Sequence, residues 1–240
     1  MQVTVCGLRG GVGTTSIVAM LADALSLMGE SVLLIDLNPS DLLRLHFNIP
    51  YADINGWAFG EAEGSGWQQH TYQVKDNLYV LPYGRHGLAT LTADIAMTVN
   101  GAALWSNQHL LAATGYAWVI FDVPSNTPHY ASLCESSDLN VLVAQADMAS
   151  HILLGQYPLA EKTKVLVNQL NVQQRLSDAV LLDWNIRYGT HLVPLSVRQD
   201  LHIQDAFAHK MPATTYFPNA SAACDVISLA TWCLVQRGVL

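Results

Sequence analysis

The sequence predicts an α/β protein built on a doubly wound, mainly parallel sheet with helices on both faces. Short continuous apolar runs alternate along the chain with longer segments whose apolar residues recur at helical spacing. The chain of 240 residues is also 51% apolar and only 12% charged, as expected where strands are buried on both faces. Its length suits one α/β core, so we expect residues 1–240 to form a single domain.

The predicted elements follow one another in a regular order. Apolar runs predict strands at QVTVC (2–6), SVLLID (31–36), NLYVLPYG (77–84), YAWVIFDVP (116–124), DLNVLVAQAD (138–147), TKVLVNQL (163–170) and THLVPL (190–195). Helical spacing predicts helices over 14–30, over about 88–115 and over 221–238, with further helical patterns between the later strands. Residues 37–70 contain two prolines and several glycines, and this composition predicts loops.

Charge and cysteine content limit the class of protein. The net charge of −8 disfavours wholesale binding to DNA or to an anionic membrane surface, so no nucleic-acid partner is expected. The four cysteines form no C-x-x-C pair, and we expect buried free thiols in a reducing compartment; they are Cys6, Cys134, Cys224 and Cys233. Since no signal peptide or membrane-spanning run is recognisable, we expect a soluble, cytoplasmic protein.

Polar residues follow the ends of the predicted strands. A glycine-rich loop begins at Gly7, and Asp36, Asp122, Asn168 and Pro194 each fall at or just past a strand end. In open parallel sheets, ligands bind at this carboxyl edge. We therefore expect one binding site to collect these positions.

The loop GLRGGVGTTS has the glycines and hydroxyls of a phosphate-binding loop. Gly10, Gly11 and Gly13 let the backbone turn tightly around phosphate oxygens. The N–H groups of the stretch that runs through Val12 to Ser16, at the start of the predicted helix, make an anion nest. A simple strand-to-helix glycine turn is the alternative, and the acidic residues at neighbouring strand ends argue against it.

The same edge offers ligands for a magnesium ion. Thr15 occupies the position of the hydroxyl that ligates Mg²⁺ in phosphate loops. Asp36 and Asp122 are carboxylates at neighbouring strand ends, suited to hold the metal ion through its waters. Asp36 is also suited to steer an attacking water and is the first catalytic candidate; Arg9 is a second one, considered below.

The loop departs from the usual pattern at one position. A phosphate loop normally continues as G-K-[ST], but here Thr14 follows Gly13. The four lysines are remote in sequence; they are Lys75, Lys162, Lys164 and Lys210. Arg9 is the nearest cation, and three roles are open for it. It binds phosphate in its own subunit, it reaches across a dimer as an arginine finger, or it is an exposed loop cation. Thr14 either donates to phosphate or caps the helix, and we favour the cap.

These motifs resemble the deviant Walker A family that includes the MinD, ParA and Soj ATPases, whose loop reads K-G-G-x-G-K-[ST]-[ST]. R-G-G-V-G-T-T-S fits in register, with Arg9 at the signature lysine, Thr14 at the P-loop lysine and Leu8 at the usual first glycine. SVLLIDLNPSD resembles switch I, with Asp36 at the first aspartate. Asn38 stands where a second aspartate helps to position water.

Later segments extend the resemblance over nearly the whole chain. WVIFDVPS resembles switch II, with Asp122 as the Walker B acid, and TKVLVNQ resembles the strand whose asparagine reads adenine. The resemblance implies that Asn168 reads the base and that Pro194 lies near it. It implies a P-loop NTPase fold, bound ATP and Mg²⁺, and a homodimer across the nucleotide. It is weakest between about residues 50 and 115.

A narrower resemblance is carried by G-x-R-G-G-V-G-T-T, the segment NPSDLLRLHFN, the pair Gly56 and Trp57, and the late stretch LATWCL. These resemble the BcsQ family, the MinD-like proteins of bacterial cellulose-secretion operons. That implies a subunit recruited peripherally to the inner membrane through partners. The implied partners are the small BcsR protein, the cyclic-di-GMP-sensing BcsE and, through these, the inner-membrane cellulose synthase.

Two substitutions predict slow or absent ATP hydrolysis. The loop lacks a cation for the β- and γ-phosphates, and Asn38 lacks a carboxylate; losing one preorganised group of this kind costs about 10²–10³ in rate. We expect an ATP-binding dimeric switch or scaffold. One alternative is an active ParA- or MinD-type ATPase that cycles on a membrane or on DNA. A basic C-terminal helix would support that alternative, but the ending ATWCLVQRGVL offers only one cation, Arg237, which argues against it. The other alternative is a nucleotide-free protein that keeps the fold for protein contacts.

Other signals are weaker. The nine histidines are scattered, so no metal site beyond Mg²⁺ is expected. His46 and Phe47 are either a partner-facing part of switch I or an ordinary amphipathic turn. The six tryptophans are expected to be core or interface anchors; they are Trp57, Trp67, Trp105, Trp118, Trp184 and Trp232.

Overall fold

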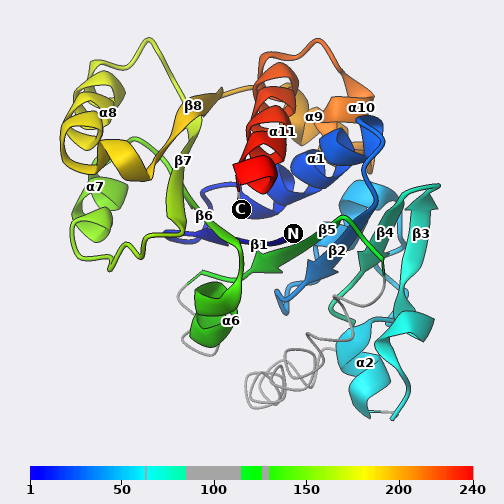
Figure 1. The fold of residues 1–240 in the computed structure, drawn as a ribbon. Helices are drawn as coiled ribbons and strands as arrows, with labels where there is room; N and C mark the ends of the chain where they lie inside the picture. Colours follow the sequence, from blue (N-terminus) through cyan, green and yellow to red (C-terminus); the bar gives the residue numbers. More distant parts are fainter. Residues whose placement is uncertain (63, 85–114, 126–129, 240) are drawn as a thin grey trace.

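The computed structural model describes residues 1–62, 64–84, 115–125 and 130–239 (Figure 1). The strands are β1 (Gln2–Gly7), β2 (Val32–Asp36), β3 (Tyr72–Lys75), β4 (Leu78–Leu81), β5 (Trp118–Val123), β6 (Leu139–Ala144), β7 (Thr163–Leu170) and β8 (Leu192–Arg198). The helices are α1 (Thr14–Leu27), α2 (Trp57–Ala62), α6 (Ala131–Ser136), α7 (Met148–Leu154), α8 (Arg175–Tyr188), α9 (His202–Ala208), α10 (Ala213–Tyr216) and α11 (Ser221–Val239). Short 3-10 turns are η1 (Leu43–Phe47), η2 (Trp67–His70) and η6 (Gly189–His191). Trp105 and nearly all of the helix predicted near 88–115 lie outside the described residues.

The eight strands form one sheet in the order β3-β4-β2-β5-β1-β6-β7-β8. Every pairing among them is parallel except that of β3 with β4. The predicted doubly wound, mainly parallel α/β fold is therefore confirmed. The antiparallel edge strand β3 is a strand that the apolar pattern did not predict, because its sequence, YQVK, has no continuous apolar run.

Helices cover both faces of the sheet (Figure 1). Successive strand residues point to opposite faces, and β2 shows the result. Val32 and Leu34 pack in a core with residues of α1 and α11, while Leu33 and Ile35 pack in a second core with Trp57 of α2. A third core lies under α7 and α8. Burial on both faces explains why the strands read as continuous apolar runs.

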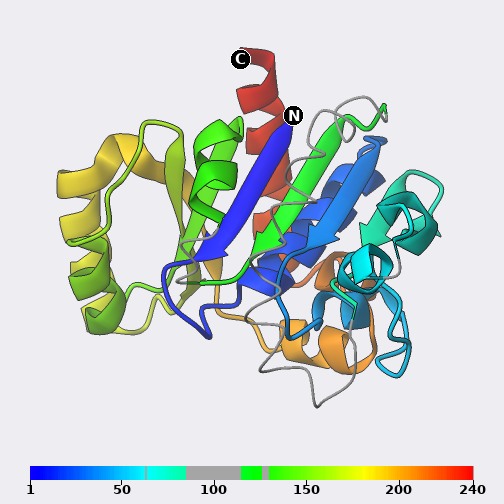
Figure 2. The ribbon, with the colours of Figure 1, turned by 90° about the horizontal axis from the view of Figure 1, so that it is seen from below.

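The carboxyl ends of the central strands meet at one edge. Figure 2 shows the arrows of β1, β2 and β5 pointing the same way, and Asp36 is the register partner of Asp122. Asn168 lies two residues before the end of β7. The strand-end placement of Pro194 is wrong: β8 continues to Arg198, so Pro194 is an exposed residue inside this strand.

The segment predicted as loops is more ordered than its glycine and proline content suggested. It contains η1, α2 and η2, and the side chains of Trp57 and Trp67 anchor it in the core. His46 is buried and its ring lies 4.7 Å from that of Phe207 on α9, while Phe47 packs against the core. The partner-facing interpretation of His46 is therefore wrong, because tertiary contacts cover this turn.

The cysteines and tryptophans differ in how far their burial matches the prediction. All four cysteines are free, but Cys224 is exposed, so the expectation of buried thiols holds for Cys233 and not for Cys224. Trp57, Trp67, Trp118 and Trp184 are buried core residues, as predicted. Among the described helices, none is long and apolar enough to cross a membrane.

Candidate functional site

The loop between β1 and α1 is shaped by glycine. Gly11 and Gly13 have φ angles of 80° and 84°, in the left-handed region. A Cβ atom on Gly13 would also lie 2.7 Å from the side-chain nitrogen of Asn168. Gly13 is the N-cap of α1, and no side chain in the described part of the chain caps the helix, so the predicted capping role of Thr14 is wrong. The first N–H groups of α1 are left without intrahelical acceptors.

These N–H groups open into a shallow pocket of about 210 Å³. It is lined by Arg9, Gly10, Gly11, Gly13, Thr14, Thr15, Ser16, Asn38, Asp122, Val123, Pro124 and Ser125. The pocket thus unites the phosphate-loop candidates with Asn38 and Asp122 from the two neighbouring strands. Val12 contributes its backbone only, since its side chain is buried in the core.

Two buried carboxylates lie at this edge of the sheet: Asp122 lines the pocket, and Asp36 is its register partner in β2. Asp36 is fully buried and Asp122 is 1% exposed. Asp36 Oδ1 accepts a hydrogen bond from the Asn38 backbone N–H at 2.8 Å, and the Thr15 hydroxyl hydrogen-bonds Asp122. The Oδ2 atoms of both carboxylates are buried and accept no hydrogen bond from the described residues. Buried polar atoms are rarely left this way.

The electrostatics of this pair favour a cation. Burial raises the pKa of Asp122 to about 7, against the opposing effect of the Thr15 hydroxyl. Burial also raises the pKa of Asp36 well above its usual range, and the negative charges of Asp122 and Asp41 add to this effect. Oxygen ligands with unfilled lone pairs are what Mg²⁺ prefers. Thr15, Asp36 and Asp122 therefore fit a magnesium ion.

Arg9 is tied to its own subunit. Its guanidinium pairs with Asp147 and donates to Gln145 Oε1 at 2.6 Å, and Gln145 in turn donates to Gln169 Oε1 at 2.6 Å. The Arg9 side chain is 29% exposed. The simple exposed-cation interpretation is therefore wrong. Arg9 is the one cationic side chain among the described residues that line the phosphate-loop pocket.

Asn168 connects the phosphate loop to a neighbouring pocket. Its Nδ2 donates to the Val12 carbonyl at 2.8 Å, and its buried Oδ1 has no partner among the described residues. The second pocket, of about 200 Å³, is lined by Gly13, Ser16, Ile17, Asn168, Gln169, Gln199, Asp200, Leu201, Ile203 and Gln204. The chain beyond the end of β8, and not Pro194, thus supplies its outer wall.

Sequence reasoning missed several of these residues. Gln145 and Asp147 follow the end of β6, so the strand-end rule that selected Asp36 would also have selected them. Asp147 additionally has the pattern of a helix N-cap, and its side chain accepts from the Ser150 N–H. No local signal identifies Gln169, which adopts a left-handed φ of 54°.

Comparison with known proteins identifies the family. The family model described as "Cellulose biosynthesis protein BcsQ" matches residues 1–234. The chain is 33% identical over 232 residues to the cellulose biosynthesis protein BcsQ of Salmonella typhi, covering 96% of this chain and 92% of that protein. It is 31% identical over 235 residues to BcsQ of Escherichia coli K12, with the same coverages.

Solved structures show the same fold at low sequence identity. A ParA family ATPase from Chlorobium tepidum superposes with a TM-score of 0.76 at 16% identity, covering 96% of this chain and 98% of that one. MinD from Pyrococcus horikoshii, solved with Mg-ADP, has a TM-score of 0.72 at 21% identity over 100% of this chain and 98% of that one. On these findings the chain belongs to the BcsQ family of cellulose biosynthesis proteins and has the fold of the MinD and ParA ATPases.

Proposed function

We propose that this protein is an ATP-binding, dimeric switch or scaffold subunit of the cellulose synthesis and secretion machinery, with slow or absent ATP hydrolysis. One observation carries the proposal. A glycine loop of the shape expected for a phosphate site shares its pocket with Asp122, whose register partner is Asp36, and each of these buried carboxylates has an oxygen without a hydrogen-bond donor among the described residues. The loop nevertheless has no lysine, and its nearest cation is engaged by Asp147. Such a site favours binding over catalysis.

Nucleotide binding rests on the backbone and the metal. The N–H groups at the start of α1 would receive phosphate oxygens. The Thr15 hydroxyl, with Asp122 and Asp36, would hold Mg²⁺, which would neutralise phosphate charge. Asn168 lines the second pocket, and its Oδ1 is a buried acceptor without a donor among the described residues; an amino group such as that of adenine would satisfy it.

Hydrolysis lacks two of its usual contributors. Thr14 places no cation at the phosphates. Asn38 lines the pocket, but its amide cannot accept a proton from water, and its Oδ1 already accepts the Ser40 N–H at 3.1 Å. Each missing group costs about 10²–10³ in rate if it acts like an oxyanion-hole donor. The bound nucleotide would then act as a lasting part of an interface.

Family membership supports the wider setting of the proposal. We propose a homodimer across the nucleotide, with BcsR, a BcsE-type cyclic-di-GMP sensor and, through them, the inner-membrane cellulose synthase as partners. The protein would be cytoplasmic and recruited to the membrane by these partners. An Arg9 finger across the dimer would first have to exchange its contact with Asp147.

The test is the nucleotide that copurifies with the protein. Purified protein is denatured, and the released nucleotide is identified by chromatography. Near-stoichiometric ATP supports the proposal, ADP supports an active positioning ATPase, and no nucleotide even after incubation with Mg-ATP refutes the site. Turnover at about 1 s⁻¹, an ordinary enzyme rate, would refute slow hydrolysis.

Two glycine variants provide a matched control for that test. Gly13→Ala puts a methyl group on a left-handed residue and against Asn168, so we expect the released nucleotide to be lost. Gly189→Ala, which lines neither pocket, meets no atom of the described residues within 4 Å and does not have a left-handed φ, so it should retain the nucleotide.

A further inference from the structure

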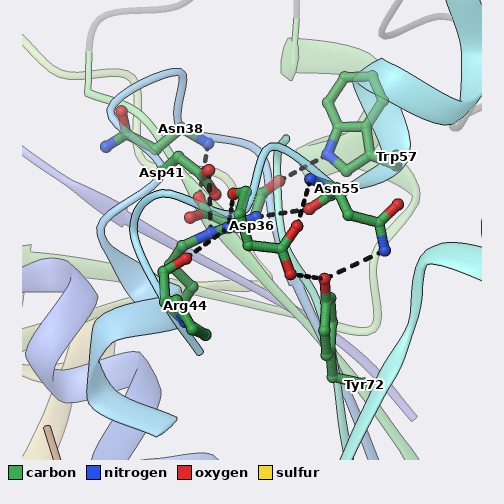
Figure 3. Close-up of polar contacts among 9 residues, drawn as sticks. Asp36, Asn38, Asp41, Arg44, Asn55, Trp57 and Tyr72 are labelled. Atoms are coloured by element: carbon green, nitrogen blue, oxygen red, sulfur yellow. Dashed lines mark hydrogen bonds and ion pairs between the residues drawn. The ribbon is translucent and has the colours of Figure 1, made fainter. Parts of the chain in front are cut away.

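The chain that follows Asp36 is organised around one buried cation. Arg44 in η1 has a side chain that is 0% exposed and pairs through Nε with Asp41 Oδ2 at 3.0 Å. Its Nη1 donates to the carbonyls of Pro50, at 3.0 Å, and Asp53, and its Nη2 donates to the carbonyl of Asn55 (Figure 3). One guanidinium therefore holds together points of the chain spread over residues 41–55.

The outer part of this segment is tied to the edge strand. The Tyr72 hydroxyl of β3 donates to Asp53 Oδ2 and accepts from Asn55 Nδ2 at 3.1 Å (Figure 3). Asp53 Oδ1 accepts the Asn55 N–H at 2.9 Å, and Asn55 Oδ1 contacts the ring of His70. The backbone segment whose carbonyls bind Arg44 is thus also attached to the sheet, through Tyr72, near Asp53 and Asn55.

The inner part of the segment meets the phosphate site. The Asp41 N–H donates to the Asn38 carbonyl at 2.9 Å, and the Asn38 N–H donates to the Asp36 carboxylate. The indole N–H of Trp57 donates to the Asp36 carbonyl at 2.7 Å (Figure 3). Asp41 adopts a left-handed φ of 53°, which a non-glycine residue holds only when its surroundings impose it.

Stability alone does not account for this arrangement. A buried ion pair costs desolvation energy and is often no more stabilising than apolar residues of the same volume. What Arg44 contributes is geometry, since its planar, forked donors bind several carbonyls that a lysine ammonium could not reach together. The segment it orders contains no strand and only the short turn η1 between Asp36 and Trp57.

We infer that Arg44 is a positioning residue, which holds residues 37–56 in the ordered conformation that places Asn38 in the phosphate-loop pocket, next to the strand end at Asp36, before any nucleotide binds. The inference rests on the proposed nucleotide function. Arg44 touches neither the phosphate-loop pocket nor its metal ligands directly; it acts through Asp41 and the backbone. The switch I-like segment is then a preformed wall of the site.

The experiment compares Arg44→Lys with Asp23→Asn. Asp23→Asn disrupts another ion pair, between the buried Asp23 of α1 and the half-buried Lys75 of β3, and controls for loss of stability as such. Hydrogen exchange of residues 37–56 is measured without nucleotide, and the affinity for a fluorescent ATP analogue is measured with Mg²⁺ and with EDTA. If Arg44→Lys leaves the segment competent in about a tenth of molecules, the apparent Kd with Mg²⁺ rises about tenfold.

The expected result has three parts. Arg44→Lys speeds exchange in residues 37–56 and weakens binding with Mg²⁺ more than binding in EDTA, while Asp23→Asn does neither. Equal exchange in the two variants, or weakening that does not depend on Mg²⁺, would overturn the positioning role. Should Arg44→Lys fail to fold, Tyr72→Phe removes the outer tether by one hydroxyl and must show the same exchange change for the inference to stand.

The two proposals fail in different ways. If the wild-type protein binds no nucleotide, the proposed function is refuted and with it the role of Arg44 at a nucleotide site. If the wild type binds but segment exchange in Arg44→Lys is unchanged, only the positioning role is refuted.

Discussion

Replacing Asp122 by asparagine removes one of the two buried carboxylates while keeping the side chain's size and its ability to accept a hydrogen bond from Thr15. Burial raises the pKa of Asp122 from 3.8 to about 7 in the folded protein. Between these values the folded state binds more protons than the unfolded state, so the free energy of unfolding falls as pH rises. A shift of about three units corresponds to about 4 kcal/mol at about 1.36 kcal/mol per unit.

We therefore expect Asp122→Asn to be more stable than the wild type at pH 8, by up to about 4 kcal/mol, when metal and nucleotide are absent. Near pH 4 the two proteins should have similar stability, because Asp122 is then protonated. Urea unfolding in EDTA across this range measures the difference. Mg-ATP should reverse the order at pH 8, because only the wild type keeps both carboxylate ligands.

The test of the raised Asp122 pKa is how the stability difference between the two proteins changes with pH. A stability difference between wild type and Asp122→Asn that is the same at pH 5 and pH 8 would refute it. Asp23→Asn provides the control, since it breaks the ion pair with Lys75 and should lower stability at both pH values.

Three further predictions concern the nucleotide. Thr14→Lys restores the loop cation and should raise ATP turnover about 10²-fold, the reverse of losing one preorganised donor. The rate of phosphate release measures turnover, and an unchanged rate would mean that Asn38 alone limits hydrolysis. Asp147→Asn keeps a helix-capping side chain but removes the ion pair that holds Arg9. Because the freed guanidinium can then bind phosphate, we expect equilibrium titration to show a few-fold tighter binding of Mg-ATP. Weaker binding would show that Arg9 acts from its present position. Removing Mg²⁺ with EDTA should weaken ATP binding by about 100-fold or more, a loss of about 2.7 kcal/mol, because the buried carboxylates then repel the phosphates; metal-independent affinity would contradict the ligand set.

Local patterns account for the parts of the site that were predicted correctly. The spacing of Gly10, Gly11 and Gly13 indicates a tight anion-binding turn whatever surrounds it. Asp36 and Asp122 each end a continuous apolar run, and parallel strands bring their carboxyl ends to one edge. Pro194 was misplaced because the apolar run THLVPL ends before the strand does, and strand pairing continues to Arg198.

By itself, the sequence determined the α/β class, the phosphate loop with its missing lysine, and the acidic residues at neighbouring strand ends, since these follow from periodicity and short-range spacing. Only the tertiary structure decided that Arg9 pairs with Asp147, 138 residues away, and that the Oδ2 atoms of Asp36 and Asp122 have no hydrogen-bond donor among the described residues. It also decided that the Arg44 guanidinium binds backbone carbonyls of the segment that follows Asp36. Such contacts depend on strand order and register, which join residues whose local sequences contain no sign of one another.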